Sequence, residues 1–140
     1  VWFYIYARFK VPSFRESPFD EFFEKTQTYY ALRREIKIFM KYFGDYLAMS
    51  KLIKVEHFGQ CYGGTEGFQC DKYIDSIECR TNTALIISRF LTQEGKIAVM
   101  IVNNSQKLPA NICVRSSYFY MKSGGKQSYW LSPGEAVWLN

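Results

Sequence analysis

The pattern of apolar and polar positions between Thr83 and Asn104 predicts a β-hairpin. Two runs rich in β-branched residues are joined by a short polar link that contains Gly95. Apolar side chains occupy both alternating sets of positions in each run, so both faces of the hairpin are apolar. A two-stranded ribbon could not keep two apolar faces in water, whereas central strands of a layered β domain bury both. The hairpin therefore predicts a layered β fold.

From Lys51 onward the chain consists of short apolar runs separated by turn-forming residues, chiefly Gly and Pro. Regularly spaced short strands with such turns are typical of a β-sandwich. The predicted strands are Leu52–Phe58, Tyr73–Cys79, Ala84–Thr92, Lys96–Asn103, Asn111–Arg115, Tyr118–Met121, Gln127–Leu131 and Ala136–Leu139.

The first part of the chain has a different pattern of apolar and polar residues. Val1–Ala7 is apolar and aromatic throughout, which is typical of a strand covered on both sides in the parallel sheet of an α/β protein. Arg8–Gln27 follows as a long loop interrupted by Pro12 and Pro18. Because the chain has no second strand like Val1–Ala7, we expect it to be the end of a longer protein.

Thr28–Met49 is the segment with helical periodicity, and Thr28 is a suitable N-cap. We expect Gly44 to break or kink the helix, with a short continuation over Asp45–Ala48. Its wide apolar stripe suits a helix that packs on a sheet. The stripe consists of Tyr29, Leu32, Ile36, Phe39, Met40, Phe43 and Leu47.

Composition narrows the classes of function. The 140 residues are 48% hydrophobic and 19% aromatic, which is too apolar for a disordered chain. The net charge is +5, but Lys and Arg are scattered, so we expect no nucleic-acid partner. No apolar run approaches the ~20 residues of a membrane span, so we expect no membrane partner.

Few residues of the sequence are candidates for a catalytic or metal-binding site. His57 is the single histidine, and its strand pattern predicts a half-buried side chain. The acidic residues before the helix all fall in one loop, so they do not supply the two opposed carboxylates of a glycosidase. We therefore expect no catalytic residue, metal or cofactor in this chain. The cysteines are too widely spaced for a zinc or redox motif, although one or two disulfides are possible. They are Cys61, Cys70, Cys79 and Cys113, of which Cys113 is expected to be a small buried thiol.

Four aromatic residues allow two interpretations. Tyr118, Tyr120, Trp130 and Trp138 could form a platform on which a sugar ring stacks. They also lie in strand-like runs, and this placement favours packing in the core, which is the interpretation we adopt.

The order of segments resembles the end of a TIM-barrel glycoside hydrolase of the β-galactosidase-type clan. The resemblance is carried by the apolar strand at the start, the Pro-Ser-Phe-Arg-Glu-Ser loop, the helix that begins Thr-Tyr-Tyr-Ala-Leu, and the Lys-Val-Glu-His-Phe-Gly run. IAVMIVNNS and LSPGEAVWL resemble closing strands of the C-terminal domain of such enzymes. The resemblance implies a mainly β fold: an antiparallel β-sandwich, residues 51–140, preceded by the last strand-loop-helix unit of a truncated (β/α)8 barrel, residues 1–50.

The resemblance also implies where substrate would bind. The long loop would lie at the C-terminal face of the barrel, where such enzymes keep their active sites. The residues expected to contact carbohydrate are Tyr4, Tyr6, Arg8, Phe14, Arg15 and Glu16. The catalytic carboxylates of this clan lie on barrel strands four and seven, which this chain does not include.

On this hypothesis the sandwich is a structural partner that packs against the barrel of a glycosidase. The alternatives are a non-catalytic carbohydrate-binding module and an adhesion or scaffold domain without sugar affinity. The sequence itself indicates no compartment; a periplasmic or secreted location follows only by analogy.

Overall fold

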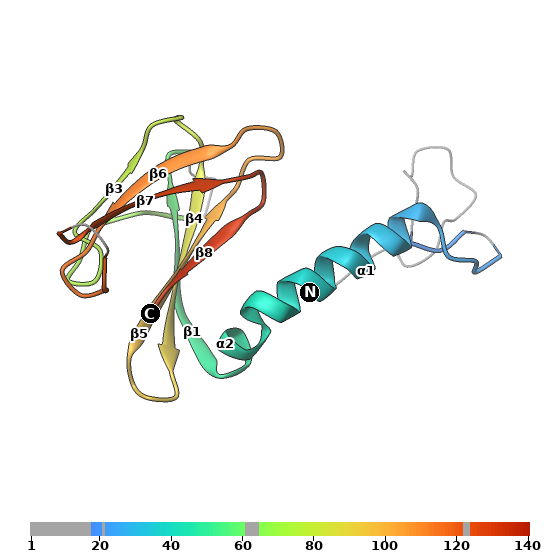
Figure 1. The fold of residues 1–140 in the computed structure, drawn as a ribbon, viewed down its shortest axis with the longest axis horizontal. Coiled ribbons are helices and arrows are strands. Elements are labelled where there is room, and N and C mark those ends of the chain that lie inside the picture. Colours follow the sequence, from blue (N-terminus) through green and yellow to red (C-terminus); the bar gives the residue numbers. More distant parts are fainter. Residues whose placement is uncertain (1–17, 21, 61–64, 122–123) are drawn as a thin grey trace. The chain divides into compact units, whose positions relative to one another are not determined.

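The computed structural model describes residues 18–20, 22–60, 65–121 and 124–140. The chain divides into two compact units, one that ends at Ala48 and one that spans Met49–Asn140. The first unit is helical in its described part, and the second is built of strands (Figure 1). The predicted barrel strand Val1–Ala7 and most of the loop after it lie outside the described residues. The barrel origin of the first unit therefore stays a prediction.

The helical unit contains one interrupted helix, as the periodicity predicts. Helix α1 spans Gln27–Phe39, a π-helical turn η1 spans Met40–Gly44, and α2 spans Asp45–Ala48. The expected interruption thus falls at Gly44. A Cβ added to Gly44 would lie 2.9 Å from Met40 Cε, so a larger residue at this position would displace the methionine side chain.

The N-cap of α1 is Thr26 and not Thr28, so the prediction of the cap was wrong. Thr26 is extended, with φ −84° and ψ 175°, and its side chain makes no capping hydrogen bond. Its backbone N–H donates to the carbonyl of Pro18 at 3.0 Å. That bond to the preceding loop fixes the chain direction at Thr26, and the helix begins directly after it.

The second unit is mainly β and consists of two sheets. The five-stranded sheet has the order β2-β1-β4-β5-β8, and the three-stranded sheet has the order β3-β6-β7. In the described part, neighbouring strands are antiparallel except β1 and β2, which are parallel. The bounds are β1 Ser50–Phe58, β2 Glu66–Gly67, β3 Ser76–Cys79, β4 Leu85–Thr92, β5 Ile97–Asn103, β6 Ala110–Arg115, β7 Lys126–Leu131 and β8 Ala136–Leu139.

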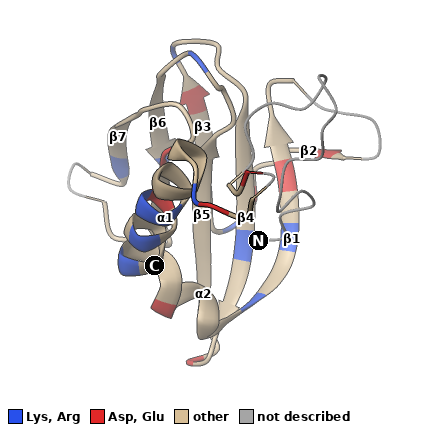
Figure 2. Ribbon diagram, turned by 90° about the vertical axis from the view of Figure 1, so that its right-hand side faces the viewer, with Lys and Arg blue, Asp and Glu red and all other residues tan. Residues whose placement is uncertain are grey.

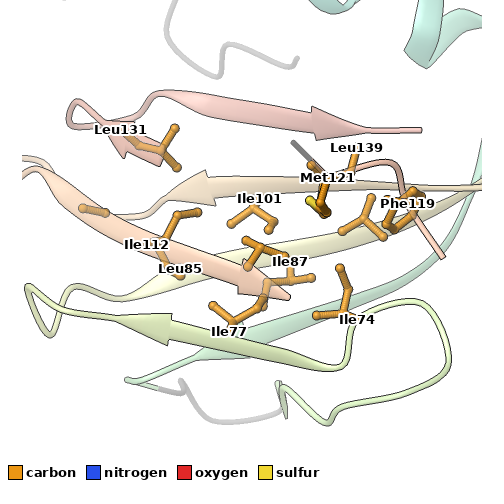
Figure 3. Close-up of a cluster of buried hydrophobic side chains, with 13 residues drawn as sticks. Ile74, Ile77, Leu85, Ile87, Ile101, Ile112, Phe119, Met121, Leu131 and Leu139 are labelled. Atoms are coloured by element: carbon orange, nitrogen blue, oxygen red, sulfur yellow. The ribbon is translucent and has the colours of Figure 1, made fainter. Parts of the chain in front are cut away.

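One apolar core lies between the two sheets (Figure 3). The predicted hairpin is the β4–β5 pair, and it supplies the centre of the core from the larger sheet. Both sheets contribute to this cluster, so the two layers form a β-sandwich. Its members are Ile74, Ile77, Leu85, Ile87, Val99, Ile101, Ala110, Ile112, Val114, Phe119, Met121, Leu131 and Leu139.

The opposite face of the β4–β5 hairpin is also largely buried, as its two-sided apolar pattern predicts. Phe90, Ala98 and Met100 point away from the core and are no more than 8% exposed. Trp138 of β8 pairs with Met100 across the sheet, and its ring centroid lies 5.1 Å from that of Phe90. Trp138 thus covers part of the outer face of its own sheet.

Two predicted strands differ from the structure. The strand predicted over Tyr73–Cys79 begins only at Ser76, because Asp71 Oδ1 accepts the backbone N–H groups of Tyr73 and Ile74, both at 2.9 Å. The strand predicted over Tyr118–Met121 is absent from the described residues of that segment. Here Ser116 Oγ accepts two backbone N–H groups, from Tyr118 at 3.1 Å and Phe119 at 2.9 Å. In both places a side-chain oxygen takes N–H groups that a strand would use.

Asn103 joins the end of β5 to two other backbone segments. Its side chain is 1% exposed, and Nδ2 donates to the carbonyls of Leu108 at 2.8 Å and of Leu131 and Ser132, both at 3.1 Å. Its Oδ1 accepts the Ser105 N–H at 2.9 Å. One amide thus holds the loop after β5 and the turn between β7 and β8.

We expect Asn103→Ala to destabilise the sandwich, because it removes the donor that buried carbonyls share. Each buried group left unsatisfied costs about 1–3 kcal/mol. Urea denaturation would measure the loss in the free energy of unfolding. Asn104→Ala is the matched control, since the Asn104 side chain is only partly buried and makes no hydrogen bond with the described residues. Equal losses in the two variants would show that the Asn103 amide is not a structural joint.

Candidate functional site

The six residues predicted to contact carbohydrate lie outside the described residues. Tyr4, Tyr6, Arg8, Phe14, Arg15 and Glu16 all fall within residues 1–17. Their role stays a prediction, and the search for a site turns to the described charges and aromatic rings of the sandwich.

The most deeply buried charges form a cluster on strands β1 and β4. Glu56 is 1% exposed and Arg89 is 6% exposed. Their side chains form an ion pair through Arg89 Nη1 and Glu56 Oε2. Arg89 Nε also donates to Asp71 Oδ2 at 3.0 Å, and Nη2 donates to the carbonyl of Gln69 at 3.4 Å. The guanidinium therefore joins strands β1 and β4 to the segment that contains Gln69 and Asp71.

The strand register explains how the cluster forms. Lys54 and Glu56 alternate on one face of β1, and Lys54 lies opposite Arg89 in the antiparallel pair. Lys54 Nζ lies 3.2 Å from Glu56 Oε1 and 3.0 Å from Glu66 Oε2. Figure 2 shows acidic and basic bands along β1, next to β4. The short strand β2 pairs in parallel with β1 and places Glu66 beside it. The hydrophobic pattern did not predict β2.

The electrostatics of this cluster suit a structural role. Burial lowers the pKa of Arg89 from its ordinary value, because the charged form loses contact with water. Glu56 offsets that cost through its ion pair with Arg89, and Asp71 Oδ2 does so by accepting a hydrogen bond from Arg89 Nε. The guanidinium carbon also lies 5.7 Å from the centre of the Phe68 ring. These contacts join separate segments of the unit, which is a structural role.

The aromatic residues do not form a single platform. Trp138 is partly buried against Phe90, which agrees with the expectation of packing. The same expectation was wrong for Tyr118, Tyr120 and Trp130, which are 46%, 89% and 65% exposed. Tyr118 and Tyr120 lie in the irregular segment after β6, where strand alternation does not apply. Trp130 lies on β7 and faces away from the core.

Trp130 belongs to a largely polar surface, the outer face of the three-stranded sheet, which we call the Trp130 face. Its positions form three rows across β3, β6 and β7. The pairings Asn111 with Trp130, and Cys113 with Glu78 and Ser128, define two of them, and Arg80 N–H donates to the Asn111 carbonyl at 2.9 Å. The rows are Arg80–Asn111–Trp130, Glu78–Cys113–Ser128 and Ser76–Arg115–Lys126.

Most side chains of the Trp130 face are open to solvent, and they are chemically mixed. Arg80, Glu78, Arg115 and Lys126 are exposed, and none makes an ion pair with another described residue. Cys113, 4% exposed, lies in the middle strand as a buried free thiol, as predicted. The sequence indicated this surface, because Trp130 occupies the same alternate positions of its strand as the polar residues Lys126 and Ser128. Tyr129 and Leu131 take the opposite, inward set.

The described residues offer no other chemical centre. Among them, no three His, Cys, Asp or Glu side chains gather in a way that could hold a metal ion. Cys70 and Cys79 are also free thiols, and Cys61 lies outside the described residues. No helix in this part of the chain is long and apolar enough to cross a membrane.

Comparison with known proteins adds no assignment: no family model, no curated protein and no solved structure matches this chain.

We expect Arg89→Met to destabilise the sandwich by up to about 3–5 kcal/mol, because it removes the buried partner of Glu56 and leaves that carboxylate with only the exposed Lys54 as an ion-pair partner. The double variant Arg89→Met with Glu56→Leu should recover much of that loss, because no buried charge is then left on either strand. Urea denaturation of the two single variants and the double variant measures the coupling. Lys96→Met is the control, since the Lys96–Glu94 pair is solvent-exposed and its loss should change little. Strictly additive losses would contradict the assignment of Arg89 and Glu56 as one unit.

Proposed function

We propose that this chain is the C-terminal part of a glycoside hydrolase, in which the β-sandwich is a non-catalytic partner of a TIM barrel. The order of segments that resembles such enzymes supports the proposal, and a mainly β unit after a helix is consistent with it. The observation that carries the proposal is the state of helix α1, in which no residue is buried.

The helix has the character of an element that packs against other structure. Ile36, Ile38 and Phe39 are 42%, 45% and 38% exposed, and Met40 in the following turn is 56% exposed. Most helical stability in proteins comes from packing of an apolar face and not from intrinsic propensity. A helix on the outside of a barrel buries such a face against the barrel strands.

A non-catalytic sandwich also fits the carboxylates of the cluster. Glu56, which is buried, and Asp71, which is exposed, both contact the same arginine, whereas glycoside hydrolysis uses two carboxylates on opposite sides of the scissile bond. The chemistry of the intact enzyme would come from carboxylates on barrel strands four and seven.

The coding sequence upstream of Val1 tests this proposal directly. We expect it to encode seven further β/α units, with a carboxylate at the end of the fourth and of the seventh strand. An upstream sequence without these units would refute the hydrolase hypothesis.

We expect the isolated chain to self-associate through the apolar side of α1, because Ile36, Ile38 and Phe39 are 42%, 45% and 38% exposed. Light scattering should show oligomers, and Ile36→Gln should reduce their fraction. Lys37→Gln changes a neighbouring polar position of the same helix and should have no comparable effect. A monodisperse wild-type monomer with α1 protected from hydrogen exchange would contradict this expectation.

Carbohydrate binding by the sandwich itself is the second candidate function. It is favoured by the 65% exposure of Trp130 on a sheet face, because a large aromatic side chain left in water suits stacking against a sugar ring. Retention of the chain on insoluble polysaccharide is the first test, and absence of retention would remove this candidate.

A further inference from the structure

We propose that the Trp130 face binds a neutral oligosaccharide, with one sugar ring stacked on Trp130 and hydroxyl groups bonded by Asn111, Arg80 and Glu78. The inference rests on the second candidate function, carbohydrate binding by the sandwich. It assigns that function to one surface and to one class of ligand.

The stacking position is open. Trp130 lies on β7, at the edge of the three-stranded sheet, and its partner across the sheet is the small polar residue Asn111. Because the indole is 65% exposed, most of its surface can be buried by a ligand. Aromatic rings buried in this way dominate the energy of many binding surfaces, since they bring large contact area at little conformational cost.

The polar groups beside the ring match sugar hydroxyls. Arg80 supplies only donors, Glu78 only acceptors, and Asn111 and Ser128 supply both. A hydroxyl group donates one hydrogen bond and accepts others, so it can use every member of this set. In the described part of the chain, these four side chains make no ion pair or hydrogen bond that would occupy them.

The dimensions favour an oligosaccharide over a single sugar. Neighbouring strands lie about 4.8 Å apart, so the row Arg80–Asn111–Trp130 spans about 10 Å across the sheet. A row of this length offers polar groups beyond the area of one sugar ring, so an oligosaccharide can contact more of the face than a monosaccharide.

A neutral ligand fits this surface better than a polyanion. Glu78 occupies the next row, beside Arg80 and Asn111, so the two charges nearest Trp130 are opposite and offer no net attraction to a phosphate or uronate group. Single-stranded nucleic acid also binds through a series of stacked rings along a basic groove, whereas the three rows of this face contain one aromatic ring. The basic pair Arg115 and Lys126 lies in the row farthest from Trp130.

The experiment is affinity gel electrophoresis of the full chain in soluble neutral polysaccharides: a β-glucan, a xylan, a mannan and a galactan. We expect at least one of them to retard the wild-type chain. Trp130→Ala should weaken that binding about tenfold or more, which corresponds to about 1.4 kcal/mol. Asn111→Ala should weaken it by a smaller factor, and it serves as the second variant if Trp130→Ala fails to fold.

The matched control is Tyr120→Ala, which removes an aromatic ring that is 89% exposed but lies outside the Trp130 face. It should bind as tightly as the wild type, and equal urea midpoints would show that all variants keep the fold. Polygalacturonate and an oligothymidylate serve as anionic probes, with salt added to identify purely electrostatic retention.

The outcomes separate the inference from the function on which it rests. Neutral binding that survives Trp130→Ala and Asn111→Ala overturns the assignment to this face but leaves carbohydrate binding intact. No binding to any neutral polysaccharide overturns both the inference and the second candidate function. Retention by polygalacturonate or oligothymidylate alone shows that the occupant is an anionic polymer and overturns the inference. None of these outcomes bears on the hydrolase hypothesis, which the upstream coding sequence decides.

Discussion

Both faces of the β4–β5 hairpin are apolar, and the need to keep both from water governs the second unit. The inner face is covered by the three-stranded sheet, which contributes Ile77, Ile112 and Val114 to the core. The outer face is covered in part by Trp138, which packs on Phe90. A sandwich with the hairpin at the centre of its larger sheet buries most of the inner face, and Trp138 of β8 covers part of the outer one.

Within this apolar frame, a few buried polar groups fix how the peripheral segments attach. Arg89 holds the segment around Gln69 and Asp71 against the sheet. Asn103, at the end of β5, holds the loop after β5 and the turn between β7 and β8. Hydrophobic burial has no directional preference, so it selects layers but not exact loop positions. A buried arginine or asparagine that must satisfy its hydrogen bonds does select them, because each unpaired group costs free energy.

The two candidate functions depend on different surfaces. The hydrolase hypothesis depends on the exposed apolar side of α1, a surface that suits a large packing partner. The carbohydrate hypothesis depends on the Trp130 face, which is largely polar and rich in mixed hydrogen-bonding groups. The first surface has the composition of an interface between elements of one fold, and the second has the composition of a surface that remains wetted. One protein could use both, since a barrel partner and a ligand-binding face do not compete for the same residues.

The sequence by itself determined the mainly β character of the second unit, the two-faced hairpin and the interrupted helix before it. These features follow from local rules, because side-chain alternation, helical period and turn residues act over a few positions. Tertiary structure alone decided the Arg89–Glu56–Asp71 cluster, the irregular backbone in place of the strand predicted over Tyr118–Met121, and the exposure of Trp130. Each depends on partners distant in the chain: Ser116 Oγ, for example, donates to the carbonyl of Tyr73, 43 residues away. Alternation showed that Trp130 shares a side with Lys126 and Ser128, but only the pairing of three strands places Asn111 and Arg80 beside it.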